Sequence, residues 1–227
     1  TIADDDDVTV DLADLSITET DDGDDQAVAI PLTLSGESGQ TITVDVETYA
    51  ITATDGSDFD VIAGTYTFYP DGTTAFEDAA TSGATDISVY GDTVNEDDET
   101  FGVIASSVTG RGVTVGVDTA MVTIADNDDV TLSIDDITIA EDDAPGVATF
   151  TLPLSGESEQ AVTVDVDVAG SGTALATLDA DFSVTTPQTV TFDAGSLSQT
   201  LDVTILDDAV HEGDETYELV LTSPTGR

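Results

Sequence analysis

Apolar and polar positions alternate along most of this chain. Residues 41–47 and 64–69 carry an apolar side chain at every second position, which is the spacing of a half-buried β-strand. Turn-forming clusters of Gly, Pro, Asp and Ser interrupt the runs about every 8–12 residues, and no long run shows helical spacing. The pattern predicts an all-β protein. In the first half we expect strands at residues 8–12, 15–18, 27–34, 41–47, 64–69, 85–90, 100–106 and 113–124.

The strand pattern occurs twice. The segment IADDDDV at residues 2–8 returns as IADNDDV at residues 124–130, an offset of 122 (124 − 2). Residues 8–19 match 130–141 at the same offset, whereas Glu99 matches Glu215 at 116 (215 − 99). The drift indicates an insertion in the first repeat, which we place within residues 73–84 and expect to form a short helical turn or a surface loop.

Each repeat holds about seven predicted strands, which is typical of an immunoglobulin-like β-sandwich. We therefore predict two tandem antiparallel β-sandwiches, at residues 8–128 and 129–227, preceded at residues 1–7 by the end of another repeat. Phe68 and Phe192 are expected to face the two cores. The second repeat stops at Gly226 and Arg227, without a counterpart of residues 113–124. We expect the sequence to be a segment of a longer chain that supplies this strand; the alternative is a strand from another molecule.

Charge narrows the function. The chain has 49 acidic residues, two basic ones (Arg111 and Arg227) and a net charge of −47. This balance argues against binding to nucleic acid or to an anionic membrane, because both require basic contacts. The alternating apolar residues argue against disorder, despite the charge. The acidic side chains must therefore be dispersed over a surface or held together by cations. An acidic surface without lysine also fits a saline habitat, in which salt screens repulsion.

Several acidic motifs resemble those of the Calx-β domain, known from sodium–calcium exchangers and from large bacterial surface proteins. They are the Glu that follows the first strands, the turns that end in Asp58-Phe59 and Asp181-Phe182, and the acidic loops at residues 89–99 and 205–215. The resemblance implies Ca²⁺ ligands at one end of each sandwich. In the first repeat these are Glu19, Asp58, Asp92, the carbonyl of Val94, Glu96, Glu99, Asp126, Asn127 and Asp128; in the second they are Glu141, Asp181, Asp207, Asp208, the carbonyl of Val210, Glu212 and Glu215.

The residue types agree with that implication, because Ca²⁺ takes six to eight oxygen ligands and no His/Cys cluster suitable for zinc is present. Gly91 departs from the pattern, since Asp207 stands at the matching position. Many other acids, such as Asp21 and Asp25, are expected to be plain solvated surface. The lone His211 has no visible nucleophile or orienting partner, and the chain lacks Trp, so we expect no enzyme.

The sequence therefore predicts a calcium-binding structural or adhesive module of a long extracellular repeat protein, in which Ca²⁺ stiffens the joints between domains. Its expected partners are calcium ions, neighbouring repeats and, in addition, homotypic assembly or a surface ligand. We expect a cell surface, and a prokaryote of a saline habitat. Two alternatives remain: a calcium-sensing regulatory module, and a filament subunit assembled by strand exchange.

Overall fold

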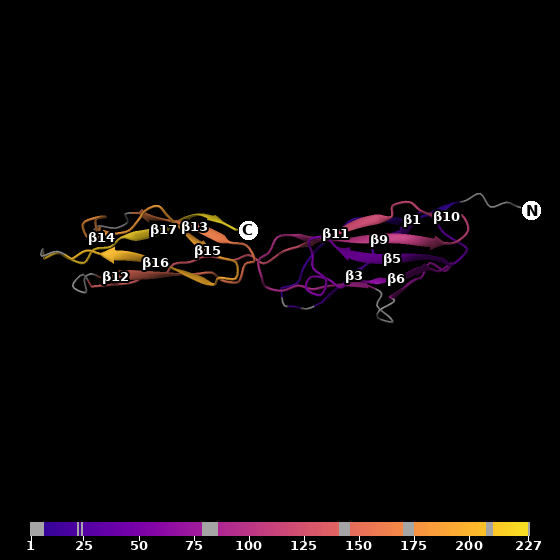
Figure 1. Ribbon diagram of the computed structural model, residues 1–227, viewed down its shortest axis with the longest axis horizontal. Helices are drawn as coiled ribbons and strands as arrows, with labels where there is room; N and C mark the ends of the chain where they lie inside the picture. The colour runs from indigo at the N-terminus through magenta and orange to yellow at the C-terminus, as the bar shows by residue number, and fades with distance from the viewer. Residues whose placement is uncertain are drawn as a thin grey trace, which may run out of the picture. The chain divides into compact units, whose positions relative to one another are not determined.

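The computed structural model describes residues 7–21, 23, 25–78, 86–140, 146–169, 175–207 and 211–226. The described residues form strands and no helix, as the alternation predicted, and none of them builds a helix long and apolar enough to cross a membrane. The chain divides into two compact units (Figure 1). Unit 1 comprises Thr1–Thr93 and Asp97–Asn127; unit 2 comprises Val94–Glu96 and Asp128–Arg227.

Unit 1 is built from eleven described strands in three sheets. The largest sheet has the order β2-β11-β9-β5-β6-β7, and the smaller ones have the orders β10-β1-β4 and β3-β8. The strands are β1 Val8–Leu12, β2 Leu15–Thr18, β3 Gln26–Ala29, β4 Leu32–Leu34, β5 Ile42–Ala50, β6 Ala63–Phe68, β7 Thr74–Asp78, β8 Asp86–Val89, β9 Glu99–Thr109, β10 Val113–Val115 and β11 Thr119–Ala125. Alternate residues of these sheets bury their side chains in one core, which includes Val10, Ile87, Val44 and Phe101. The unit is thus a β-sandwich, as predicted.

Two predicted strands are each divided in the structure. Pro31, which has no N–H to donate, separates β3 from β4 within the expected strand 27–34. Residues 116–118 separate β10 from β11, and this break lets β10 pair with β1 in one sheet while β11 pairs with β9 in another. Asp11 fixes the segment in which the chain passes from one sheet to the other, because its carboxylate accepts the Val117 N–H at 2.8 Å. Two pairings, β1 with β10 and β2 with β11, are parallel, so the antiparallel prediction was incomplete.

The insertion contains a strand. Residues 74–78 form β7, which pairs antiparallel with β6 from Gly64↔Asp78 to Phe68↔Thr74. The expected helical turn was therefore wrong over these residues, because Thr74, Ala75 and Phe76 extend the edge of the large sheet. The rest of the predicted insertion, residues 79–84, lies outside the described residues.

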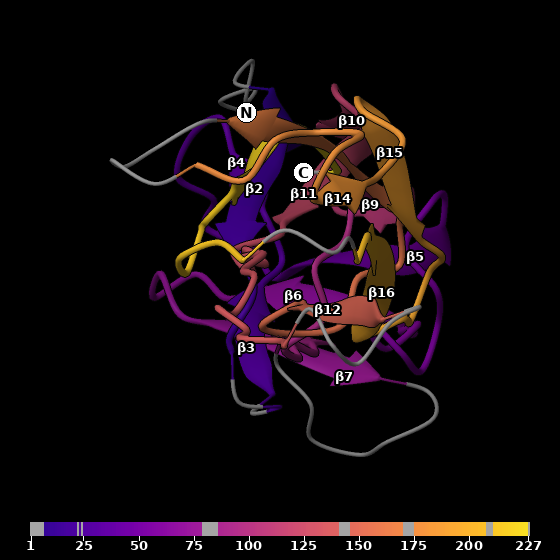
Figure 2. The same cartoon turned by 90° about the vertical axis from the view of Figure 1, so that its left-hand side faces the viewer.

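Unit 2 has two described three-stranded sheets, β12-β16-β14 and β15-β13-β17. Their strands are β12 Val147–Pro153, β13 Val162–Ala169, β14 Phe182–Ser183, β15 Gln188–Phe192, β16 Ser198–Ile205 and β17 Glu218–Thr225. β12 and β16 pair from Val147↔Thr204 to Pro153↔Ser198 and lie side by side in both views (Figures 1 and 2). Phe192 is fully buried between the sheets and Phe68 is buried in unit 1, as predicted.

The two units repeat local geometry as well as sequence. Phe59 stacks on Phe101 with ring centroids 4.2 Å apart, and Phe182 stacks on Tyr217 at the same distance. In both units an Asp immediately precedes the first ring of the pair and accepts a backbone N–H four residues earlier at 2.5 Å. These matched turns place Asp58 and Asp181 at corresponding positions.

The sequence match of residues 130–141 to residues 8–19 does not extend to strand structure in the described residues 130–140. Residues 130–140 were expected to repeat β1 and β2, yet they form no strand apart from a bridge between Leu132 and Leu154. In unit 1, β1 and β2 are paired by β10 and β11. The described part of unit 2 contains no counterpart of β10 or β11 with which residues 130–140 could pair in the same way.

Candidate metal centre

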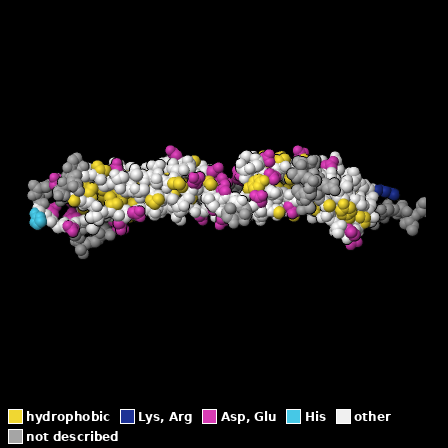
Figure 3. Space-filling view, turned by 90° about the horizontal axis from the view of Figure 1, so that it is seen from below, with side chains coloured by type: hydrophobic (Ala, Val, Ile, Leu, Met, Phe, Trp, Pro, Cys, Tyr) yellow, Lys and Arg dark blue, Asp and Glu magenta, His cyan; other side chains and the backbone are white. Residues whose placement is uncertain are grey.

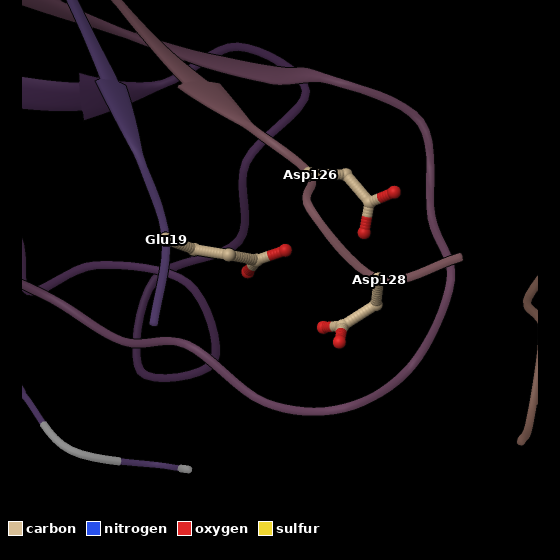
Figure 4. A group of neighbouring side chains, drawn as sticks. All are labelled: Glu19, Asp126 and Asp128. Atoms are coloured by element: carbon tan, nitrogen blue, oxygen red, sulfur yellow. The ribbon is translucent and has the colours of Figure 1, made fainter. Parts of the chain in front are cut away.

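Three carboxylates meet where β2 and β11 end. Glu19 directly follows β2, and Asp126 directly follows β11, because the parallel register pairs Thr18 with Ala125. The Glu19 N–H donates to the Ala125 carbonyl at 3.2 Å and fixes the two strand ends side by side. Asp128 completes the group, and an oxygen of each residue lies within 4.8 Å of the others. Figure 4 shows the three carboxylates directed toward a common space.

A second group joins Asp58, Glu96 and Glu99, again with oxygens within 4.8 Å of one another. Asp58 is held by its turn: one carboxylate oxygen accepts the Thr54 N–H, and its carbonyl accepts the Tyr90 N–H at 2.9 Å. Glu99 is the first residue of β9, which pairs with β11. The two groups therefore draw ligands from chain segments that the sandwich topology brings together.

All six carboxylates are half-buried, which makes their proximity costly. Two unit charges about 4 Å apart repel by roughly 4 kcal/mol at an effective dielectric near 20. The chain offers two basic residues against 49 acidic ones, so an external cation is the natural counter-charge. Elsewhere acidic side chains are dispersed among other types, as the visible face in Figure 3 shows. For those residues, hydration and dissolved salt are sufficient to screen the repulsion between carboxylates.

The donor set fits Ca²⁺. Every side-chain donor is a carboxylate oxygen, whereas zinc prefers nitrogen and sulfur ligands. Two oxygens bound to one Ca²⁺ at about 2.3–2.6 Å are at most about 5 Å apart, and the spacing in both groups satisfies this limit. Each group can thus supply three ligands to one ion.

Asp98 and Asn127 make hydrogen bonds near the first group that the sequence did not reveal. The Asp98 carboxylate accepts the Asp126 N–H at 3.3 Å and so restrains the first group. Asn127, a predicted ligand, is exposed and donates its side-chain amide to Asp21. Asp21, which was expected to be only a solvated surface residue, therefore accepts a hydrogen bond from Asn127. The run of acids at residues 96–99 was the one available signal for Asp98.

Asn95 is a further residue that sequence reasoning missed. The segment Val94–Glu96 belongs to unit 2, and Asn95 is completely buried there. Its side chain accepts from Ser158 Oγ at 3.1 Å and donates to the Asp128 carbonyl at 2.6 Å. Its backbone bonds Glu157 and Glu159. Asn95 thereby fixes the main chain next to two of the clustered acids, Glu96 and Asp128.

Gly91 explains why unit 1 has no acid where unit 2 has Asp207. A Cβ atom on Gly91 would lie 2.0 Å from the carbonyl oxygen of Thr20 and 2.4 Å from its nitrogen. The chain leaving Glu19 thus passes directly over Gly91, and a side chain at this position would displace it. The absence of a side chain at residue 91 therefore allows the main chain of Thr20 to approach this loop closely.

The predicted ligands divide into three sets. Six are brought together: Glu19, Asp58, Glu96, Glu99, Asp126 and Asp128. The two groups do not include Asp92, and the carbonyl of Val94 stays a prediction. In unit 2, Asp181 is half-buried, and Asp207, Glu212 and Glu215 are exposed; no three carboxylates of its described residues lie as close. Glu141, Asp208 and Val210 lie outside the described residues.

The chain is thus an all-β protein of two consecutive β-sandwich domains. Its clustered carboxylates, at the ends of strands of the first sandwich, have the spacing of a metal-binding site. The Calx-beta domain model matches residues 3–128 and again residues 125–227. The chain therefore belongs to the Calx-beta domain family and carries two consecutive members, as its motifs indicated.

Solved structures similar to this chain include two that are named CBD12 and one that is named CBD1. CBD12 from CALX1.2 is 19% identical over 96% of this chain and 80% of that chain, with a TM-score of 0.42. The calcium binding domain CBD12 of CALX1.1 is also 19% identical, over 92% and 77%, with a TM-score of 0.40. The apo-form Calx CBD1 domain is 23% identical over 54% of this chain and all of its own length, with a TM-score of 0.41.

Proposed function

We propose that this chain is a calcium-binding structural module. The observation that carries the proposal is the pair of carboxylate groups Glu19-Asp126-Asp128 and Asp58-Glu96-Glu99. Each offers three half-buried oxygens at a spacing that one Ca²⁺ can bridge, with carbonyls or water completing the shell. Binding removes carboxylate repulsion from the folded state alone and therefore adds to the free energy of unfolding.

We further propose that bound Ca²⁺ stiffens the joint between the units. Support comes from the order of the chain, because Asp126 belongs to unit 1 and Asp128, two residues later, is the first residue of this segment in unit 2. A cation held by both leaves the connection little freedom. Small-angle scattering should then give a narrower distribution of particle lengths with Ca²⁺ than with chelator.

A mechanical module of this kind suits a long extracellular repeat protein, with a role in adhesion or in a filament at a prokaryotic cell surface. The net charge of −47 supports this setting, because saline medium screens the dispersed carboxylates and supplies Ca²⁺ at high concentration. The absence of cysteine means that folding needs no oxidation. Homotypic assembly and binding of a surface ligand belong to the same proposal.

The test is a thermal melt and a calcium titration by calorimetry on the 227-residue chain. We expect Ca²⁺ to raise the melting midpoint relative to chelator, with a Kd between micromolar and millimolar. The double variant Glu19→Gln/Asp128→Asn should lose most of this shift. The matched control Glu37→Gln/Asp193→Asn removes the same charge from exposed positions outside both groups and should retain it.

An unchanged midpoint in the original chain would refute the proposal. A Kd below micromolar would instead indicate the sensor alternative, because regulatory sites respond to far lower calcium than extracellular modules.

A further inference from the structure

Unit 1 exposes an aromatic side chain on the outer face of its large sheet. β5, β9 and β11 lie next to one another in this sheet (Figure 1). Tyr49 of β5 and Met121 of β11 are 43% and 45% exposed, whereas the residues that precede them, Thr48 and Ala120, are buried. Because successive side chains of a strand point to opposite faces of the sheet, Tyr49 and Met121 both point away from the core.

The two exposed residues lie on either side of Gly102. The register pairs Tyr49 with Gly102 on one side of β9 and Met121 with Gly102 on the other. A Cβ atom on Gly102 would lie 2.2 Å from Cζ and 2.5 Å from the hydroxyl oxygen of Tyr49. The phenol therefore lies across the main chain of β9, in a space that a side chain at residue 102 would fill. The exposed part of Tyr49 is then the side of the ring that faces away from the sheet.

The fold itself does not require this arrangement. In unit 2 the matching strands are β13 and β17, and the matching pair is Ala169↔Glu218, at offsets of 120 (169 − 49) and 116 (218 − 102). Unit 2 thus builds the same pair of strands with an alanine and a glutamate at these positions. The combination of Tyr49 and Gly102 is specific to unit 1, which favours a role in binding over a role in folding.

Carboxylates flank the exposed ring. Glu47 is exposed on the same face of β5, two residues before Tyr49 and thus roughly 7 Å away along the strand. Asp14 is exposed beside Met121, because its carboxylate accepts the Met121 N–H at 2.8 Å. Arg111, the one basic residue in the described part of the chain, lies beyond the opposite end of β9. A cation that pairs with these two carboxylates must therefore come from outside the described chain.

An exposed aromatic face next to carboxylates suits an organic cation. The face of an aromatic ring attracts a positive charge. A guanidinium group can stack on such a ring while it donates two parallel N–H bonds to a carboxylate, which an ammonium group cannot do. The methylene stem of an arginine adds apolar contact, for which the flexible thioether of Met121 is suited. The net charge of −47 attracts cationic ligands and repels anionic ones.

We propose that the outer face of the large sheet of unit 1 binds an arginine side chain of a partner protein. The guanidinium stacks on Tyr49 and donates to the Glu47 carboxylate, and the methylene stem packs against Met121. The inference gives a chemical class to the surface ligand of the proposed adhesive role, and it is independent of the two calcium groups, which contain none of these three residues. A second copy of this chain is disfavoured as the partner, because two chains of charge −47 repel each other.

Met121 is the one methionine of the chain, so an isotope-labelled methionine methyl group gives a single NMR signal at the proposed site. The experiment titrates the 227-residue chain with the peptide acetyl-Gly-Arg-Gly-amide, in excess Ca²⁺ and about 0.5 M NaCl, which screens nonspecific attraction. We expect a saturable shift of the methyl signal with a millimolar Kd. A peptide with lysine in place of arginine should bind more weakly, and one with glutamine should not bind.

Two variants test the ring and the carboxylate separately. Tyr49→Leu should weaken binding of the arginine peptide about three- to fivefold. Tyr69→Leu is its matched control, because Tyr69 is also 43% exposed but lies in the turn after β6. Glu47→Gln should weaken binding about twofold or more and reduce the preference for arginine over lysine, whereas Glu37→Gln, which also removes one exposed carboxylate, should not.

Three results would overturn the proposal: no saturable shift up to about 100 mM peptide, an equal response to the glutamine peptide, or unchanged binding by both Tyr49→Leu and Glu47→Gln. Dimers that form with increasing chain concentration and are abolished by Arg111→Gln would also overturn it, because the occupant would then be a second copy. Calcium binding has a separate readout, since Tyr49→Leu should retain the Ca²⁺-dependent rise of the melting midpoint. The arginine site and the proposed calcium function can therefore fail or hold separately.

Discussion

Gly91 occupies a position where any side chain would collide with the main chain of Thr20. The obstacle is backbone rather than a flexible side-chain end, so relaxation requires moving the segment that carries Glu19. We predict that Gly91→Ala lowers the free energy of unfolding of unit 1 by about 2 kcal/mol or more. Gly91→Asp, which restores the acid found at Asp207, should be at least as destabilising. Urea unfolding measures both.

Gly36→Ala is the control for this prediction, because nothing lies within 4 Å of a Cβ built on Gly36 and its φ is not positive. Its free energy of unfolding should stay within about 0.5 kcal/mol of the parent. A Gly91→Asp chain that is equally stable and binds more Ca²⁺ would show that Thr20 moves aside easily, contrary to the geometry.

Tyr90 is the second residue with a distinct expectation. The hydrogen bond that its phenol donates to Asp60, together with partial burial and the negative charges of Asp60, Asp25 and Asp55, raises its pKa to about 12. The unfolded value is near 10, so the folded state retains this proton where the unfolded state loses it. The Tyr90 contribution to stability is therefore complete below pH 10 and lost between pH 10 and 12.

The alkaline range is well suited to this measurement, because the chain has no lysine and its carboxylates are already ionised. Tyrosinate absorbance should show one phenol titrating near pH 12, and Tyr90→Phe should remove it. Tyr217, whose pKa burial also raises, is the internal comparison, because the Tyr90→Phe change leaves its titration intact. A Tyr90→Phe chain with an unchanged stability profile between pH 10 and 12 would contradict the assignment.

At the scale of elements, β9 and β17 are counterparts with different surroundings. β9 pairs with β5 on one side and β11 on the other, whereas among the described strands β17 pairs only with β13. We predict that amides on the outer edge of β17 exchange with solvent at least about tenfold faster than those of β9. Hydrogen exchange with mass spectrometry measures this difference. β5 and β13, each paired on both sides, should be more alike, and equal protection of β9 and β17 would refute the prediction.

Period-two alternation was sufficient to predict most elements, including β1 and β2 with their observed bounds. It failed where a partner strand decides the outcome. Residues 130–140 have the same alternation as β1 and β2 but form no strand, because no described strand pairs with their outer side. β7 was missed for the opposite reason: its own pattern is weak, and the edge of β6 makes it a strand.

The candidate metal centre likewise has features that the sequence predicts and features that it does not. Glu19, Asp126 and Asp128 could be proposed from motif positions, since they follow strands whose ends meet. The amide bond of Asn127 to Asp21 and the burial of Asn95 depend on contacts between distant segments, for which a single sequence carries no signal. Gly91 was visible as a departure from the motif, but its cause is the path of the Thr20 main chain, which no sequence pattern indicates.

At the scale of the whole molecule, the balance of charge makes stability depend on the medium. With 49 acidic and two basic residues, the compact state carries self-repulsion that unfolding relieves. We predict that the melting midpoints of both units rise as NaCl increases from about 10 mM to 1 M, because the Debye length falls from about 30 to 3 Å. A midpoint independent of salt would show that the dispersed carboxylates do not influence folding.

Calcium should act differently from salt, because four of the six clustered carboxylates belong to unit 1, namely Glu19, Asp58, Glu99 and Asp126. In chelator we expect two calorimetric transitions, with unit 2 melting first, since the core of its described residues has 13 buried apolar side chains against 20 in unit 1. Millimolar Ca²⁺ in 1 M NaCl should move the unit 1 transition upward and leave that of unit 2 nearly unchanged. Mg²⁺ at equal concentration is the control; its octahedral geometry and firmly held water suit half-buried carboxylate groups poorly, so it should shift unit 1 less. Equal shifts of both transitions would mean that unit 2 binds Ca²⁺ as strongly as unit 1, without the groups that carry the proposal.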